Sequence, residues 1–128
     1  MATDISPPIP AGRSFIRSYN ARGFVIGDQS HVGPVLVLPD RVLPVVLEAI
    51  ADLRLEHLEP VFIARPAIEV LLVGSGSTMV MLGRELRTAI RGRGPTVDPM
   101  ATPAACRTLN VLMAEDRRVA ALLFPAGA

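Results

Sequence analysis

The sequence predicts an α/β fold built as one domain. With 128 residues, half of them hydrophobic, the chain can bury a core without help from disulfides or metal ions. Its first half contains short apolar runs separated by turn residues. Its second half alternates strand, helix, strand, helix and strand. This alternation is typical of parallel strands joined by right-handed crossovers.

Glycine and proline divide the first half into short elements. We expect strands at residues 14–19, 23–26 and 35–38. The last of these is a continuous apolar run with a proline at each side, which indicates a strand covered on both faces. Residues 42–53 are ambiguous, because Val45, Val46 and Leu47 favour a strand whereas residues 48–53 could equally be helical. Residues 55–64 predict a short helix, with Pro60 early enough to be tolerated.

Helical and strand periodicities alternate in the second half. Residues 69–73 predict a buried strand, 96–98 a short strand and 119–124 a final apolar strand. A helix between the first two is predicted by apolar side chains on one face, at Leu82, Leu86, Ala89 and Ile90. A second helix opens with Thr102 as the expected N-cap and Pro103 at its first position.

Composition excludes several classes of function. The 13 basic residues are all arginine, and the net charge is +1. Nothing therefore favours binding of nucleic acid, and a Walker-A lysine or Schiff-base chemistry is excluded. One cysteine and two histidines do not form a zinc motif. We predict no metal site, no cofactor and no catalytic residue.

Cysteine usage and hydropathy suggest the cellular compartment of the protein. Cys106 is the single cysteine, which fits a reducing compartment. Residues 1–13 contain three prolines and no apolar signal segment, so a flexible N-terminal arm is expected, followed by one domain over residues 14–128. No apolar run is long enough to cross a membrane. We expect a soluble cytoplasmic protein.

Gly74, Ser75 and Gly76 follow a predicted buried strand. Glycine lets backbone N–H groups approach an anion, so this loop is a candidate phosphate cradle. A dinucleotide fingerprint would require a third glycine where Met79 stands, although Asp98 falls roughly where a ribose-binding acid belongs. The structural alternative is a tight turn at the strand exit.

The start of the last helix supplies a second group of candidates. If the strands at 69–73 and 96–98 are parallel neighbours, Thr102 emerges beside the glycine loop. Thr102 and Ala104 lie where free N–H groups point outward, and Arg107 and Asn110 share one helix side. We therefore predict an anion-accepting crevice at this edge. The alternative is that Arg107 and Asn110 only tie loops together.

Other reactive groups favour structural interpretations. Ser75 lacks the G-x-S-x-G pattern of a nucleophile, and neither histidine has a triad context. Cys106 sits in a first helical turn, which could lower its thiol pKa, although a small buried residue is the commoner case. Arg84, Arg87, Arg91 and Arg93 form a basic stripe without interleaved aromatics, which favours a solvated helix face.

Three segments together carry a family resemblance: EVLLVGSG at 69–76, MATPAACRTLNVL at 100–112 and EDRRVAAL at 115–122. Over residues 14–125 the chain resembles the Mth-type family of domains of unknown function, whose mitochondrial member assists assembly of respiratory complex I. Three positions depart from the family pattern. Ser75 replaces a threonine, Leu109 a tyrosine and Val45 a tryptophan.

The resemblance implies a three-layer α/β fold with a mixed central sheet and an N-terminal β meander. It also implies a strand at residues 45–47. For function it implies a non-catalytic assembly protein whose partners are complex I subunits or assembly machinery. Two alternatives remain: a module or enzyme for a small anionic ligand at the crevice, and a homo-oligomer that covers an apolar interface.

Overall fold

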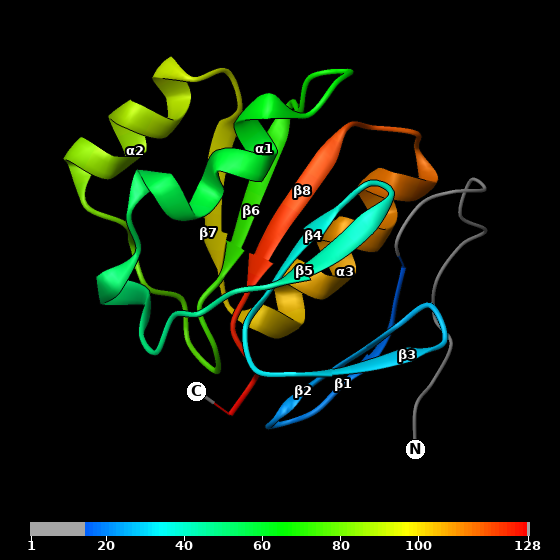
Figure 1. Cartoon of the computed structure of the whole chain (residues 1–128). Helices are drawn as coiled ribbons and strands as arrows, with labels where there is room; N and C mark the ends of the chain where they lie inside the picture. Colours follow the sequence, from blue (N-terminus) through cyan, green and yellow to red (C-terminus); the bar gives the residue numbers. More distant parts are fainter. Residues whose placement is uncertain (1–14, 128) are drawn as a thin grey trace.

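The computed structural model describes residues 15–127. The expected arm at residues 1–13 lies outside this range. The elements follow the order that the sequence predicts, with additions at the N-terminal end (Figure 1). No helix of residues 15–127 is long and apolar enough to cross a membrane.

Three antiparallel strands form a small sheet near the N-terminal end. They are β1 (Ile16–Tyr19), β2 (Gly23–Ile26) and β3 (Gln29–Val32), paired in that order. The β2–β3 turn contains Gly27 at φ +61°, a conformation that favours glycine. This sheet confirms the expected N-terminal meander. Strand β3 was not predicted, because it is polar and mostly exposed and so lacks apolar alternation.

The central sheet is mixed and has five strands in the order β5-β4-β8-β6-β7. The strands are β4 (Val35–Leu38), β5 (Arg41–Pro44), β6 (Val70–Gly74), β7 (Thr96–Met100) and β8 (Val119–Leu123). Strand β6 runs parallel to both β7 and β8, whereas β4 runs antiparallel to β5 and β8. The parallel half confirms the expected crossover architecture.

Helices cover both faces of this sheet and give the fold three layers. The helical segments are η1 (Ile50–Asp52), η2 (Leu55–Leu58), α1 (Glu59–Ile63), α2 (Arg84–Gly92) and α3 (Thr102–Ala114), where η marks 3₁₀ geometry. Figure 1 shows α1 and α3 on opposite faces of the sheet. The predicted helix at 55–64 is therefore a 3₁₀ turn that continues into α1.

The core is divided by the sheet into two clusters, as side-chain alternation in strands requires. Leu36 and Leu38 of β4 pack with Phe62 and Ile90 on the side of α1 and α2. Val35 and Val37 of the same strand, one position out of phase, pack on the side of α3 and the small sheet. All four strand residues are buried, which confirms the prediction of a strand covered on both faces.

The strand expected at residues 45–47 is absent, and this prediction is wrong. Strand β5 ends at Pro44, which pairs with Val35 at the first position of β4. Beyond it, the N–H of Val45 still reaches the carbonyl of Pro34 at 3.1 Å, but β4 offers no further residue to pair with. Val46 is consequently 96% exposed.

Candidate functional site

The glycine loop and the start of α3 lie together at the carboxyl ends of the parallel strands. The N–H of Ser75 donates to the carbonyl of Met100 at 3.0 Å, and the N–H of Thr102 donates to the carbonyl of Gly76 at 2.8 Å. The structure thus brings Gly74, Ser75, Gly76 and Thr102 side by side. This juxtaposition follows from the parallel pairing of β6 with β7.

Thr102 does not cap its helix, contrary to the prediction. The N-cap is Ala101, and no side chain bonds to the first turn there. The hydroxyl of Thr102 instead donates to the carbonyl of Phe124 at 2.7 Å and accepts the N–H of Gly76 at 2.8 Å. This side chain is fully buried. It therefore faces inward, across the end of β8, rather than back along the helix.

These hydrogen bonds already occupy N–H groups of the glycine loop that an anion would need. An anion cradle requires N–H groups that point at open space. The N–H groups of Ser75 and Gly76 are already bonded to Met100 and Thr102. The hydroxyl of Ser75 donates to the carbonyl of Thr78 at 2.7 Å and accepts the N–H of Val80 at 2.8 Å. The loop thus has the contacts of a structured strand exit.

Arg107 and Asn110 point in different directions from α3. Arg107 is exposed, and Asn110 is buried. The amide of Asn110 accepts the N–H of Ile16 at 3.0 Å and donates to the carbonyl of the same residue at 2.8 Å. Asn110 therefore ties β1 to α3, at about 12 Å along the helix from Thr102.

The anion-accepting crevice that the sequence predicts, with its seven residues, therefore remains a prediction. The structure brings four of these residues together, and half-buried Ala104 lies two residues after Thr102 in α3. Amide NMR during titration with inorganic phosphate tests it. Saturable shifts at Gly76 and Ala104 support the crevice, and unchanged signals at millimolar phosphate exclude it.

Cys106 is buried, and the alternative of an activated thiol is contradicted. Desolvation by burial raises the pKa of the Cys106 thiol from 9.0 to about 12, although the nearby Arg107 charge opposes this shift. A nucleophilic cysteine needs the opposite change. The helix start therefore does not activate this side chain.

His57 has a structural contact in the described part of the chain. The Nδ1 atom of His57 accepts the N–H of Arg54 at 2.9 Å and so closes the first turn of η2. Within residues 15–127, no group of three or more His, Cys, Asp or Glu side chains is placed to hold a metal ion.

The basic stripe of α2 is divided in two. Arg93 pairs with Glu59 at 3.3 Å and lies 4.4 Å from the ring centre of Phe62, so its charge is used within the fold. Arg84, Arg87 and Arg91 line a groove of about 310 Å³ beside the edge strand β7. Arg84 and Arg91 are exposed there, whereas Arg87 is half-buried.

Sequence reasoning missed two features of the site. The acceptors of the Thr102 and Ser75 bonds are backbone carbonyls, which carry no residue-specific signal in the sequence. It also missed a cavity of about 540 Å³ at the opposite end of β6 and β8, lined in part by Arg41, Arg65 and Arg118. Those arginines come from three separate segments, so no local motif could have revealed them.

Comparison with known proteins decides the family. A family model described as "Protein of unknown function (DUF498/DUF598)" matches residues 16–124. The chain belongs to the DUF498/DUF598 family. A zebrafish (Danio rerio) relative named NADH dehydrogenase [ubiquinone] 1 alpha subcomplex assembly factor 3 is 37% identical over 110 residues. That alignment covers 86% of this chain and 63% of the relative, so the chain spans less than two thirds of that relative's length.

Solved structures of other proteins have the same fold as this chain. A protein described as an outer membrane protein from Bartonella henselae superposes with a TM-score of 0.81 at 38% identity, covering 92% of this chain and 98% of that one. A Bordetella pertussis protein described as a Mth938-like domain superposes with a TM-score of 0.80 at 26% identity, covering 98% of this chain and 94% of that one. The resemblance to the Mth-type family and its fold is thereby confirmed.

Proposed function

We propose that this chain is a non-catalytic protein that binds partner proteins during assembly of respiratory complex I. The main observation in support is the similarity of this chain to a relative named as a complex I assembly factor. This similarity extends over 86% of this chain. The family match over residues 16–124 includes both sheets and α3, so it extends over the folded unit and is not confined to a short motif.

An exposed apolar segment supports partner binding. Met79, Val80 and Met81 follow one another in the loop between β6 and α2 and are 51%, 39% and 55% exposed. Large contiguous apolar patches are uncommon on monomeric proteins and mark contact sites, and methionine is enriched in protein interfaces. We assign the partner contact to this segment, which we call the methionine loop (residues 79–81).

The internal bonding of the glycine loop favours this role over a small-ligand function. An anion in the crevice would have to displace Met100 and Thr102 from the N–H groups of Ser75 and Gly76. The displaced carbonyl of Met100 and hydroxyl of Thr102 would each lose a hydrogen-bond partner, at a cost of about 1–3 kcal/mol for each group left unsatisfied. The small-ligand function therefore stays the second candidate.

Gene disruption with complementation tests the proposal in the native cell. Without this protein, fully assembled complex I on native gels and NADH:ubiquinone oxidoreductase activity should both fall. Wild-type protein should restore both, and the double variant Met79→Ser with Met81→Ser should not. Val111→Ser is the matched control, because Val111 is 46% exposed on α3, away from that loop in sequence. Normal complex I in the disrupted strain contradicts the proposed function.

A further inference from the structure

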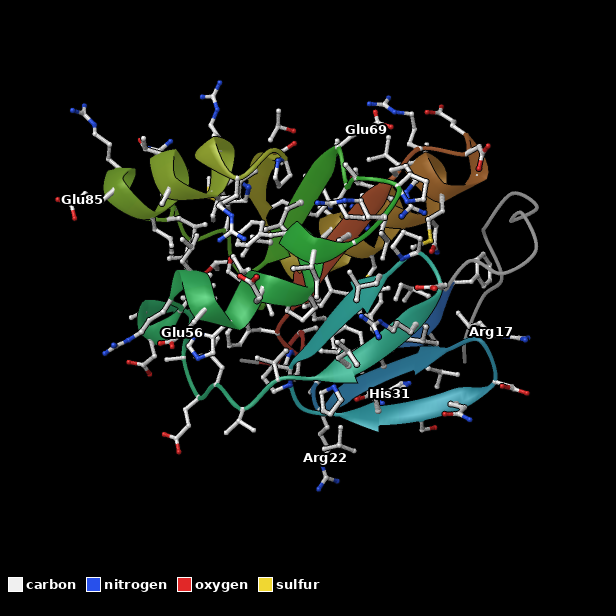
Figure 2. All side chains as sticks on the ribbon, turned by 45° about the horizontal axis from the view of Figure 1, so that its top comes forward. Arg17, Arg22, His31, Glu56, Glu69 and Glu85 are labelled. Carbon is white, nitrogen blue, oxygen red and sulfur yellow. The ribbon has the colours of Figure 1, made fainter. Side chains whose placement is uncertain are left out.

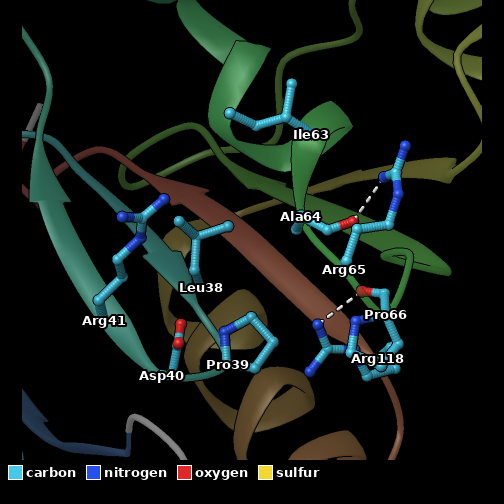
Figure 3. Close-up of a pocket in the computed structure, with 9 residues that line it drawn as sticks. All are labelled: Leu38, Pro39, Asp40, Arg41, Ile63, Ala64, Arg65, Pro66 and Arg118. Carbon is cyan, nitrogen blue, oxygen red and sulfur yellow. Dashed lines mark hydrogen bonds between the residues drawn. The ribbon is translucent and has the colours of Figure 1, made fainter.

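A cavity of about 540 Å³ opens at the amino ends of β6 and β8, away from the glycine loop. The β4–β5 turn, the segment between α1 and β6, and the residue before β8 line it (Figure 3). Its volume lies in the range of small-molecule sites, about 300–1,000 Å³. The cavity is therefore large enough for a metabolite-sized ligand.

Three arginines from distant parts of the chain line this cavity. Arg41 begins β5, Arg65 follows α1, and Arg118 precedes β8. Asp40 is the one carboxylate among the lining residues. Within residues 15–127, none of the three arginines has an ion-pair partner. Positive charge thus exceeds negative charge among the described residues that line the cavity, and none of the ion pairs within residues 15–127 neutralises it.

Backbone carbonyls hold two of these arginines in place. Arg118 donates from Nη2 to the carbonyl of Pro66 at 2.6 Å, and Arg65 donates from Nη1 to the carbonyl of Ala64 at 2.7 Å (Figure 3). Fixing one edge of a guanidinium leaves its other donors in a defined orientation, which reduces the entropy lost on binding. Arg41 forms no such bond within the described chain and extends from the facing strand.

Arg118 also carries an unsatisfied donor. Its Nε atom is buried and has no hydrogen-bond partner among the described residues. A buried N–H without an acceptor costs free energy, so the fold does not fully satisfy this guanidinium. Guanidinium groups present paired N–H donors that match the oxygens of carboxylate and phosphate.

We propose that this cavity binds a small oxyanion, a phosphate or carboxylate group, held between Arg118 and Arg41 with Arg65 adding positive charge. Leu38, Pro39 and Ile63 supply apolar walls for the body of such a ligand. This inference does not rest on the assembly role, and either can fail without the other. The oxyanion belongs to a free metabolite or to an acidic side chain of a bound protein, and both present the same group to the arginines.

The test is titration of the isotope-labelled full chain with inorganic phosphate and, separately, with acetate, at constant ionic strength maintained with chloride. Backbone amides of Asp40, Arg41 and Arg118 and the Nε–H signal of Arg118 should shift and saturate. Arg41→Gln should weaken binding at least about ten-fold, the loss expected for one charge-assisted hydrogen bond. The Arg41 side chain has no bond to the rest of the described chain, so this variant should keep its fold.

Two further variants make the outcome decisive. Arg118→Gln should abolish saturation, and dispersed amide signals show whether it remains folded. Arg17→Gln should bind as the wild type, because Arg17 is an exposed residue of β1 that points away from the body of the protein (Figure 2). Tighter binding of phosphate indicates a phosphorylated ligand, and tighter binding of acetate a free or side-chain carboxylate. Shifts that never saturate, that chloride reproduces, or that saturate with unchanged affinity in Arg41→Gln overturn the proposal.

Discussion

Thr102 joins three parts of the fold through one hydroxyl group. It bonds the glycine loop and the end of β8 while standing at the start of α3. Thr102→Val keeps the shape but leaves the Gly76 N–H and the Phe124 carbonyl unpaired, so the free energy of unfolding should fall by about 1–3 kcal/mol. Chemical denaturation measures this. Thr88→Val, exposed on α2, should change it by less than about 0.5 kcal/mol, and equal losses would contradict the role of Thr102.

Cys106 makes stability depend on alkaline pH. Burial raises its thiol pKa from 9.0 to about 12, so the unfolded chain ionises first as pH rises. The stabilising contribution is complete below pH 9.0 and is lost as pH rises toward 12. Denaturation on both sides of pH 9.0 should show a decline that Cys106→Ala lacks. The native thiol should also resist alkylation until the chain unfolds, and rapid alkylation of the native protein would exclude this assignment.

At the scale of elements, Gly74 sets how closely β6 packs on α3. A Cβ atom there would lie 3.0 Å from Leu123, 3.1 Å from Ala105 and 3.1 Å from the Cα of Thr102. Gly74→Val should therefore destabilise the fold by about 1–3 kcal/mol. Gly92→Ala on α2 meets no atom within 4 Å and should stabilise it by up to about 1 kcal/mol. Thermal denaturation of both variants checks the prediction, and an unchanged melting temperature for Gly74→Val would refute it.

The elements also show what the sequence could and could not predict. Strand β6 was predictable because it is a continuous apolar run that ends at a glycine, and helix α3 because its apolar residues follow helical spacing after a proline. Strand β3 was not, since pairing with β2, rather than burial, holds its polar residues. Residues 45–47 have strand-forming valines but no partner strand, and pairing is a property of the whole sheet.

The same distinction applies to the candidate site. Proximity of Thr102 to Gly76 was predictable, because parallel neighbours end at one sheet edge. The inward direction of the Thr102 side chain was not, because its acceptor is the backbone of Phe124, twenty-two residues later in the chain. The arginine cavity depends on three separated segments, and only the folded chain brings them together.

At the scale of the whole molecule, similarity to a named assembly factor and the exposed methionine loop support the proposed action through partners. The direct measurement is capture of the tagged full-length protein from its native cell in mild detergent, with quantitative mass spectrometry and a tag-only control. We predict enrichment of complex I subunits with the wild type and with Val111→Ser, and loss of this enrichment with Met79→Ser and Met81→Ser combined. Recovery of the bait alone, or equal enrichment with the methionine variant, would contradict partner binding through this loop.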